Sequence, residues 1–366
     1  MLSKERHGLI LKELALKDSL TVTEFAARFG ISGMTVRRDL ATLEAEGLLN
    51  RVHGGAIAAG PQAGAGPRGG TGRSGRTSRA ALATIGMVVP SASYYFPGII
   101  RGAEAAAQDL GVRLVLGVSK YSAPEEGLQI RRLLASGIDG LLVTPSGESL
   151  AGTPTLELLA AAQVPVVVVE RSIEDVLDPG TLESVRSDHV RGAEIAVNHL
   201  LALGHQRIAL FARDSSPTAT PLAEGYGIAL KKAGIGHDPS LVRTIMSAPS
   251  DPEALRRQIE EILHWLAGTD VTAVIVHNDE DALMFADSCL ARKLHVPGDL
   301  AIVAYDDEIA SLGSVPLSAV APPKFDVGNQ ALRMCLDRIS SRRGTPTALQ
   351  RISLAPSLVI RESSAS

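Results

Sequence analysis

The hydrophobic and polar positions of residues 32–56 predict a helix followed by a short hairpin. Apolar side chains recur there at the spacing of one helix face, and they belong to Val36, Leu40 and Leu43. Ser32 stands where its hydroxyl can accept a hydrogen bond from the amide of Thr35, as an N-cap does. After Gly47 the pattern changes to a loose alternation that ends in two glycines, which is typical of a hairpin.

Two further helices are predicted before this segment, over Lys4–Leu16 and Thr21–Phe29. Three helices and a hairpin make a winged helix-turn-helix, in which the third helix lies in the major groove of DNA and the wing reaches the neighbouring phosphates. The predicted DNA contacts lie on the cap and the free surface of the third helix and on the wing, and they are Ser32, Met34, Thr35, Arg37, Arg38, Arg51 and His53.

Two adjacent arginines carry most of this DNA-binding prediction. One of Arg37 and Arg38 can contact a guanine with both arms of its guanidinium, and the other can contact a phosphate. A surface helix with solvated arginines is the alternative, as is a protein-interaction module of the same size. His53 either packs within the wing or meets a phosphate.

From residue 84 onward, short apolar runs alternate with helical stretches. The predicted strands are Thr84–Val89, Arg113–Leu116, Gly140–Val143, Val166–Val169, Ile208–Phe211, Ala273–Val276, Ala301–Ala304 and Ser357–Ile360. The predicted helices include Gly98–Leu110, Glu125–Ala135, Arg191–Leu203, Pro252–Leu266 and Asp281–Leu294. This alternation predicts parallel sheets covered on both faces. The length exceeds one hydrophobic core, so two α/β lobes with a cleft between them are expected.

Ligands of such sheets bind beyond the carboxyl ends of the strands. Side chains at these ends include Tyr94, Tyr95, Phe96, Ser146, Glu170, Arg171, Asp188, His277, Asn278 and Asp306. Aromatic rings can stack on the face of a sugar ring, and carboxylate or amide oxygens can accept its hydroxyls. The pattern therefore favours a polyhydroxylated ligand, and packing between the lobes is the alternative for the three aromatic residues.

Composition separates the two regions. Residues 58–83 are dominated by Gly, Pro, Ser and Arg, which predicts a flexible linker. Residues 1–82 contain twelve Lys and Arg against seven Asp and Glu, whereas the remainder contains 24 against 33. A basic end on an acidic body fits a nucleic-acid headpiece on a separate sensor. Gly64–Gly69 matches the dinucleotide motif in letters only, because no strand precedes it.

Two resemblances follow from longer motifs. The stretches LTVTEFAARFGIS, MTVRRDLATLEAEGLL and NRVHGGA resemble the headpiece of the DeoR family over residues 3–57. The stretches LALGHQRIAL, VAYDDE and LVIRESS resemble the sensor of the LacI/GalR family, over nearly all of residues 84–364. The resemblances imply a small winged helix-turn-helix domain (1–57), a linker (58–83) and a two-lobed periplasmic-binding-protein-like (type I) α/β sensor with parallel sheets (84–366).

The LacI/GalR resemblance implies a set of effector-facing positions, which are Tyr95, Phe96, Ser146, Arg171, Asp188, Asn278 and Asp306. The chain departs from the family at Leu222, where the family's usual ligand-binding arginine would stand three residues before Gly225 and Tyr226. It also lacks the family's own headpiece and hinge helix. The identity of the effector therefore does not carry over from either family.

Catalysis is not indicated. The acidic triplets at 279–281 and 306–308 follow predicted strands, where acids at helix starts are common. The sequence contains no Ser-His-Asp elbow, no histidine pair at metal spacing and no Walker loop. Cys289 and Cys335 form no metal motif or disulfide framework, so neither a metal nor a cofactor is expected.

Together these features predict a cytoplasmic transcriptional regulator, because neither a signal peptide nor an apolar run of membrane-spanning length is found. We expect a homodimer that acts as a repressor, binds double-stranded operator DNA and responds to a sugar-like effector. The alternatives are a solute-binding protein of a transport system and a Rossmann-type enzyme. The DNA-binding headpiece opposes the first alternative, and the absence of a dinucleotide motif in the right context opposes the second.

Overall fold

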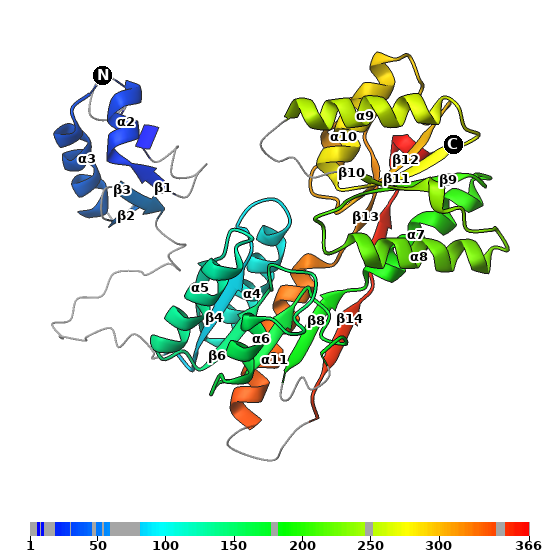
Figure 1. Cartoon of the computed structure of the whole chain (residues 1–366). Helices are drawn as coiled ribbons and strands as arrows, with labels where there is room; N and C mark the ends of the chain where they lie inside the picture. The colour runs from blue at the N-terminus through cyan, green and yellow to red at the C-terminus, as the bar shows by residue number, and fades with distance from the viewer. Residues whose placement is uncertain are drawn as a thin grey trace. The chain divides into compact units, whose positions relative to one another are not determined.

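The chain forms two units, residues 1–77 and 78–366, which are described separately (Figure 1). The computed structural model describes residues 6–7, 9–10, 19–29, 31–45, 49–52, 55–58, 81–176, 182–245, 252–341 and 348–365. No helix within these ranges is long and apolar enough to cross a membrane.

The first unit contains two described helices and a three-stranded sheet. Its elements are β1 (Ser19–Thr21), α2 (Val22–Phe29), α3 (Gly33–Ala45), β2 (Leu49–Val52) and β3 (Gly55–Ala58). The strands are antiparallel in the order β1-β3-β2. Phe25 of α2 and Val36, Leu40 and Leu43 of α3 are buried in one core. The apolar face that the sequence predicts for the third helix is therefore the buried face.

Two details of this unit differ from the sequence prediction. The prediction placed the hairpin in residues 48–55. In the structure β2 pairs with the antiparallel strand β3, which begins at Gly55, so the hairpin extends beyond the predicted limit. The sequence analysis also missed β1, which has only three residues and pairs with β3. Residues 6–7 and 9–10 of the first predicted helix are helical, and the rest of that helix lies outside the described residues.

The second unit begins with a lobe built on a parallel sheet, which we call the N-lobe. Its strands follow the order β14-β8-β7-β6-β4-β5. They are β4 (Thr84–Val89), β5 (Arg113–Val118), β6 (Gly140–Val143), β7 (Val166–Val169), β8 (Glu183–Ser187) and β14 (Arg351–Leu354). Its helices are α4 (Phe96–Leu110), α5 (Ala123–Ala135), α6 (Pro154–Ala160) and α11 (Lys324–Ser341). Helices α4 and α11 cover one face, and α5 and α6 cover the other.

The other lobe, the C-lobe, repeats this arrangement with the strand order β10-β9-β11-β12-β13-β15. Its strands are β9 (Ile208–Arg213), β10 (Val242–Ile245), β11 (Ala273–His277), β12 (Ala301–Tyr305), β13 (Ser318–Ala321) and β15 (Ser357–Val359). Its helices are α7 (His189–Ala202), α8 (Ala219–Lys232), α9 (Pro252–Leu266) and α10 (Asp279–Ala291), with short 3-10 turns at η1 (Pro239–Leu241), η2 (Ala310–Leu312) and η3 (Glu362–Ser364). Only β15 runs antiparallel to its described neighbour.

The expected two-lobed α/β architecture is confirmed. The apolar strand residues are buried on both faces of each sheet, as parallel strands require. The described chain passes between the lobes three times, from β8 to α7, from β13 to α11 and from β14 to β15 (Figure 1). The ends of β4, β7, β11 and β12 lie at one cleft, since residues directly after β7, β11 and β12 and residues of the loop after β4 line the same cavity.

Candidate functional site

Helix α3 begins with the cap that the sequence predicts. The Ser32 hydroxyl accepts a hydrogen bond from the amide of Thr35 at 3.1 Å, and the two hydroxyl groups lie 2.8 Å apart. The Ser32 carbonyl accepts from the amide of Val36 at 3.2 Å. Ser32 therefore fixes the start of the helix, which is a structural role at a position also expected to meet DNA.

The free face of α3 is a stripe of exposed side chains. Met34 is 72% exposed, and Arg38 and Thr42 follow it at four-residue intervals and are also exposed. This stripe lies opposite the buried Val36 and Leu40, so α3 has one face in the core and the other face exposed. Thr42, whose hydroxyl donates to the carbonyl of Arg38 at 3.1 Å, belongs to the stripe and was not among the predicted contacts.

A buried carboxylate anchors the N-terminal residues to α3. Asp39 is 5% exposed and accepts from Arg6 through both carboxylate oxygens, at 2.7 and 3.1 Å, while its Oδ1 lies 3.2 Å from Nε2 of His7. Burial opposes ionisation of Asp39, but Arg6 and His7 outweigh burial and lower its pKa. A concavity of about 510 Å³ beside this cluster is lined by Arg6, His7, Met34, Thr35, Arg38, Asp39 and Thr42.

Three predicted DNA contacts cannot be placed as side chains. Arg37 lies in α3 and Arg51 lies in β2, but their side chains are outside the described structure, and so is the whole of His53. The sequence analysis missed Arg6, His7 and Asp39. An acid on a helix face that otherwise carries apolar side chains was the available signal, because such an acid needs a partner when it is buried.

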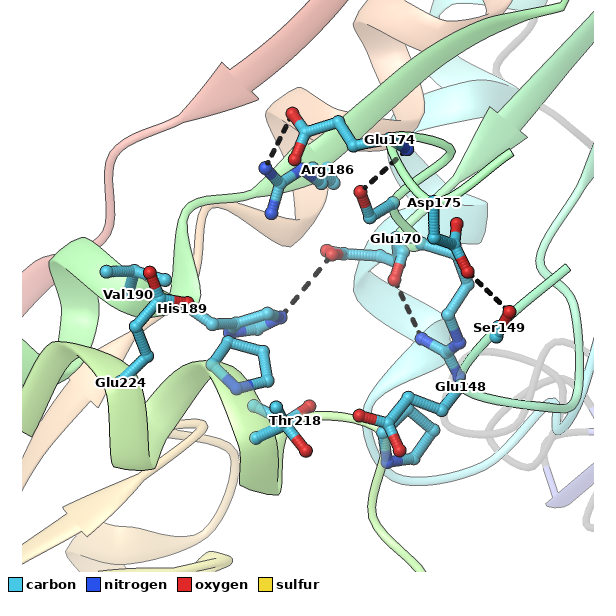
Figure 2. A pocket seen from close by; sticks show the side chains of 15 residues that line it. Glu148, Ser149, Glu170, Glu174, Asp175, Arg186, His189, Val190, Thr218 and Glu224 are labelled. Atoms are coloured by element: carbon cyan, nitrogen blue, oxygen red, sulfur yellow. Dashed lines mark hydrogen bonds and ion pairs between the residues drawn. The ribbon is translucent and has the colours of Figure 1, made fainter. Parts of the chain in front are cut away.

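Two adjacent cavities lie between the lobes and share several lining residues. The inner chamber, of about 110 Å³, is lined by Tyr94, Tyr95, Phe96, Tyr121, Glu170, Arg171, His189, Ser216, Pro217, Thr218, His277, Asn278 and Asp306. The outer chamber, of about 500 Å³, is lined by Glu148, Ser149, Glu170, Arg171, Ser172, Glu174, Asp175, Arg186, His189, Val190, Pro217, Thr218, Thr220, Pro221 and Glu224. Figure 2 shows His189 and Glu224 on one wall of the outer chamber and Glu148 and Glu170 on the other.

Asp306 forms the C-lobe side of the inner chamber. It is 4% exposed, its Oδ2 accepts from the Tyr94 hydroxyl at 3.0 Å, and its main chain is held at a φ of 107°. Burial raises the pKa of Asp306 well above its usual range, and the nearby Asp279 carboxyl adds to this effect. A protonated Asp306 can both donate to and accept from a ligand hydroxyl.

Glu170 forms the N-lobe side. Its carboxylate accepts from the amide and the hydroxyl of Ser187, at 3.0 and 2.7 Å, and from the Tyr95 hydroxyl at 3.1 Å. Nε2 of His189 lies 3.7 Å away (Figure 2). Burial opposes ionisation of Glu170, but His189 and Ser187 outweigh burial and lower its pKa to about 2. Glu170 is thus a charged group whose oxygens already have donors.

His277, which lines the inner chamber, has a buried nitrogen without a partner. The side chain is 6% exposed, and its Nδ1 has no hydrogen-bond partner in the described structure. Burial lowers the pKa of His277 to about 3, so the ring is neutral at physiological pH. A buried polar atom without a partner marks a place where a ligand can bond. The adjacent Asn278 also lines the chamber, although its Oδ1 caps α10 by accepting from the amide of Asp281 at 3.3 Å.

Five of the seven predicted effector residues line the inner chamber: Tyr95, Phe96, Arg171, Asn278 and Asp306. The other two are engaged elsewhere. The Ser146 hydroxyl donates to Glu126 at 2.7 Å, and the Asp188 carboxylate caps α7 by accepting from the amide of Arg191 at 2.9 Å. Leu222, the departure from the LacI/GalR pattern, is fully buried in the C-lobe core beside α7.

Several lining residues escaped the sequence analysis although the same signal could have found them. Tyr121 follows β5, Thr218 follows β9, and His189 comes two residues after β8. The strand-end argument covered only some of the strands, so the ends of β5 and β9 were not considered. Applied to every parallel strand, the argument identifies these residues as well.

The acidic triplets have structural partners. The Asp279 carboxylate accepts from the amides of Glu308 and Ile309, at 2.6 and 2.9 Å. Asp281 receives two bonds from Arg213, at 2.7 and 2.6 Å, and Asp307 receives one from Arg361 at 2.6 Å. These carboxylates join loops and helices and are not directed at a common reacting atom.

A winged helix-turn-helix unit joined to a two-lobed sensor with a polar cleft defines a ligand-responsive DNA-binding regulator. Residues 6–62 match the DeoR-like helix-turn-helix domain, and residues 197–364 match the periplasmic binding protein-like domain. The HTH-type transcriptional regulator DegA of Bacillus subtilis (strain 168) is 30% identical over 283 residues, covering 76% of this chain and 80% of DegA. The chain belongs to the LacI/GalR family of transcriptional regulators, with a DeoR-like headpiece.

Two further relatives agree with this assignment. The arabinose metabolism transcriptional repressor of Geobacillus stearothermophilus is 28% identical over 352 residues, which is 94% of this chain and 90% of that repressor. The solved complex of the transcriptional regulator CelR with cellobiose is 27% identical, with a TM-score of 0.65 over 76% of this chain and 84% of CelR. The protein is therefore a DNA-binding transcriptional regulator controlled by a small-molecule effector, and it is not an enzyme.

Proposed function

We propose that this protein is a cytoplasmic repressor that binds operator DNA as a homodimer and is controlled by a sugar-like effector in the cleft between the lobes. The observation that carries the proposal is the inner chamber, where aromatic rings and hydroxyl-binding groups from both lobes converge. A ligand held by both lobes favours one relative position of the lobes, and it can change DNA affinity only through that difference. The relatives named above, an arabinose repressor and a cellobiose-bound regulator, support this ligand class.

The proposed DNA surface consists of the free face of α3 and the wing. Met34, Thr35 and Arg38 would face the major groove, with Arg37 beside them, and Ser32 would hold the start of the helix against the backbone. Arg51 and His53 would reach the flanking phosphates. The exposed stripe on α3 and the basic composition of residues 1–82 support this assignment.

The proposed effector site uses Tyr95 and Phe96 as an aromatic wall and Asp306 and Asn278 as hydroxyl-binding groups, with Arg171 at the junction of the chambers. The pKa of Asp306, which burial raises well above its usual range, supports a neutral hydroxyl as its partner. Ser146 and Asp188 would not contact the effector directly and would only position neighbouring residues. The Ser146 side chain bonds to Glu126, and the Asp188 side chain caps α7.

The proposed domain limits are 1–57 for the headpiece, 58–83 for the linker and 84–366 for the sensor. A second copy of the chain would pack along the edge strand β5, where Leu116 is 42% exposed and one row of backbone groups has no strand beside it among the described residues. A dimer presents two headpieces to two half-sites about one helical turn of DNA apart.

An electrophoretic mobility shift tests the DNA surface. The full chain is titrated onto DNA from its own promoter region at two salt concentrations, beside the double variant Arg37→Ala with Arg38→Ala. We expect the variant to lose the shift, because contacts to phosphates supply most of the affinity. Each phosphate contact adds about 0.9 to the steepness with which the logarithm of the binding constant falls against the logarithm of the salt concentration. Asp306→Ala is the matched control and should bind DNA normally while responding less to the effector. A shift that survives the double change contradicts the assigned surface.

A further inference from the structure

One arginine of the cleft lacks a carboxylate partner. Nε of Arg171 donates to the carbonyl of Gly147 at 3.2 Å, and its Nη1 donates to the carbonyl of Glu170 at 2.8 Å. No carboxylate of the described residues forms an ion pair with this guanidinium, and Nη2 has no described partner. Burial lowers the pKa of Arg171, but an arginine keeps its charge in a protein. The cleft therefore contains a cation with unused donors.

The titratable groups that line the inner chamber with Arg171 have hydrogen-bond partners or shifted pKa values of their own. Glu170 is ionised, but Ser187 and Tyr95 donate to it and His189 lies beside it. Burial raises the pKa of Asp306 well above its usual range and so favours its neutral form, and it lowers the pKa of His277 to about 3, so that ring is neutral at physiological pH. Glu170 and Glu126 favour the charged form of Arg171 from a distance, but no carboxylate of the described residues lies within ion-pairing reach of its guanidinium.

The facing wall supplies no competing cation. The cleft residues contributed by the C-lobe are His189, Val190, Ser216, Pro217, Thr218, Thr220, Pro221, Glu224, His277, Asn278 and Asp306, and none is Lys or Arg. Arg186, the second arginine of the outer chamber, is paired with Glu174 at 3.4 Å (Figure 2). Leu222 lies in the C-lobe core, so helix α8 brings no positive charge to the cleft.

The position of Arg171 links the two chambers, since it lines both of them. A ligand in the inner chamber would meet Asp306 and Asn278 at one end and the guanidinium at the other. Charge-assisted hydrogen bonds from a guanidinium to a carboxylate are stronger than bonds to a neutral hydroxyl, and they fix orientation as well. An uncharged sugar would leave Nη2 of this half-buried guanidinium without an ionic partner.

We propose that the effector is a small polyhydroxylated carboxylic acid, whose carboxylate binds Arg171 and whose hydroxyls reach Asp306 and Asn278. This proposal rests on the proposed function of the cleft as the effector site. One carboxylate matches the one guanidinium nitrogen, Nη2, that has no partner among the described residues. A phosphate monoester would bring a second charge against Glu170 and the exposed Glu148 and Glu224 of the outer chamber, so a carboxylate fits better than a phosphate.

Matched ligand sets test this proposal. The probes are aldonates and uronates of four to six carbons, each with the neutral sugar and the sugar phosphate of the same carbon skeleton. Binding to the full-length protein is measured by calorimetry and by the thermal midpoint of unfolding, which rises when a ligand binds the folded state. We expect at least one acid to bind more tightly than its neutral and phosphorylated counterparts.

Variants of Arg171 then test whether this side chain binds the carboxylate of the ligand. Arg171→Gln should weaken binding of that acid by at least about tenfold, because charge-assisted bonds are lost. Arg171→Lys should restore part of the affinity, since a point charge remains without the guanidinium geometry. Arg186→Gln removes a paired cleft arginine and is the matched control, expected to change the affinity by less than about twofold.

Several outcomes overturn the proposal. They are the failure of every acid to bind, preference for a neutral sugar or a sugar phosphate, and an acid affinity that Arg171→Gln leaves unchanged. A neutral sugar that binds and releases the operator would overturn the carboxylate site and leave the proposed function intact. An acid that binds through Arg171 without affecting operator binding would support the site and contradict the proposed function.

Discussion

At the scale of single residues, environment decides which polar groups can act on a ligand. Glu170 and Asp306 are both nearly buried carboxyl groups of the same chamber. Glu170 accepts three hydrogen bonds and lies beside His189, so it is ionised. Asp306 accepts one hydrogen bond from Tyr94, and burial together with the nearby Asp279 raises its pKa well above the usual range, which favours the neutral form. Two residues of similar chemistry thus offer a ligand different partners, which no sequence pattern distinguishes.

The ionised state of Glu170 has a measurable consequence for stability. Its pKa falls from 4.5 to about 2 on folding, so its contribution is complete above pH 4.5 and is lost as the pH falls toward 2. Linkage then gives a loss of about 1 kcal/mol between pH 7 and pH 4. We expect Glu170→Gln to destabilise the sensor at pH 7 by an amount that shrinks on acidification. Urea unfolding at several pH values measures the difference.

The control for Glu170→Gln is Glu148→Gln, which removes an exposed carboxylate from the same cleft. Its effect on stability should be within about 0.5 kcal/mol at every pH. If the free energies of unfolding of the original protein and the Glu170→Gln variant differ by the same amount at pH 7 and at pH 4, the assigned ionisation of Glu170 is wrong.

The sequence predicted part of the site at this scale. Tyr95, Asn278 and Asp306 were found because they follow strands of a parallel sheet, whose carboxyl ends meet at the cleft. Ser146 and Asp188 satisfy the same rule, but their side chains bond to Glu126 and to the first turn of α7. Those contacts depend on how the loops pack, and the spacing of residues in the chain does not encode them.

At the scale of elements, helices α4 and α11 meet through glycines. A Cβ atom on Gly102 would lie 1.9 Å from the carbonyl oxygen of Phe325, and one on Gly328 would lie 1.9 Å from that of Ile99. The two backbones therefore approach more closely than any side chain allows. Because α11 follows directly from the crossover after β13, this contact fixes α11 in the N-lobe next to a connection between the lobes.

Gly102→Ala tests the helix contact. The added methyl group meets backbone, which cannot rotate away, so we expect a loss of at least about 2 kcal/mol of sensor stability. Gly236→Ala is the matched control, since a Cβ atom there has no neighbour within 4 Å, and it should be neutral or slightly stabilising. Denaturant unfolding of both variants gives the comparison. Equal stability of the two variants would exclude a close contact between α4 and α11.

Elements differed in how well the sequence predicted them. The strands Thr84–Val89, Gly140–Val143 and Val166–Val169 and the helix Pro252–Leu266 were predicted with the observed limits, because buried parallel strands and amphipathic helices have strong patterns. The analysis missed β10, β13 and β14. These are strands of four residues, which become strands only by pairing with β9, β12 and β8.

At the scale of the whole molecule, the chain combines a DeoR-like headpiece with a LacI/GalR-type sensor. The composition of residues 58–83 predicts a tether that transmits orientation poorly. Control by the effector is then expected to act through the spacing of two headpieces on a dimer, which sets their effective concentration at two half-sites. The length of the tether, more than its sequence, should matter for such a mechanism.

Deleting residues 60–78 tests this expectation. A flexible tether of about 25 residues spans roughly 25–30 Å on average, whereas the few residues left after the deletion reach much less far. Two half-sites lie about 34 Å apart, so we expect the deletion to weaken operator binding and to alter its dependence on the effector. Replacing the same residues by a Gly/Ser segment of equal length should preserve both, as measured by mobility shift with and without effector. If the deletion leaves both unchanged, the spacing of the headpieces does not depend on the tether, and control must run through direct contact between the two units.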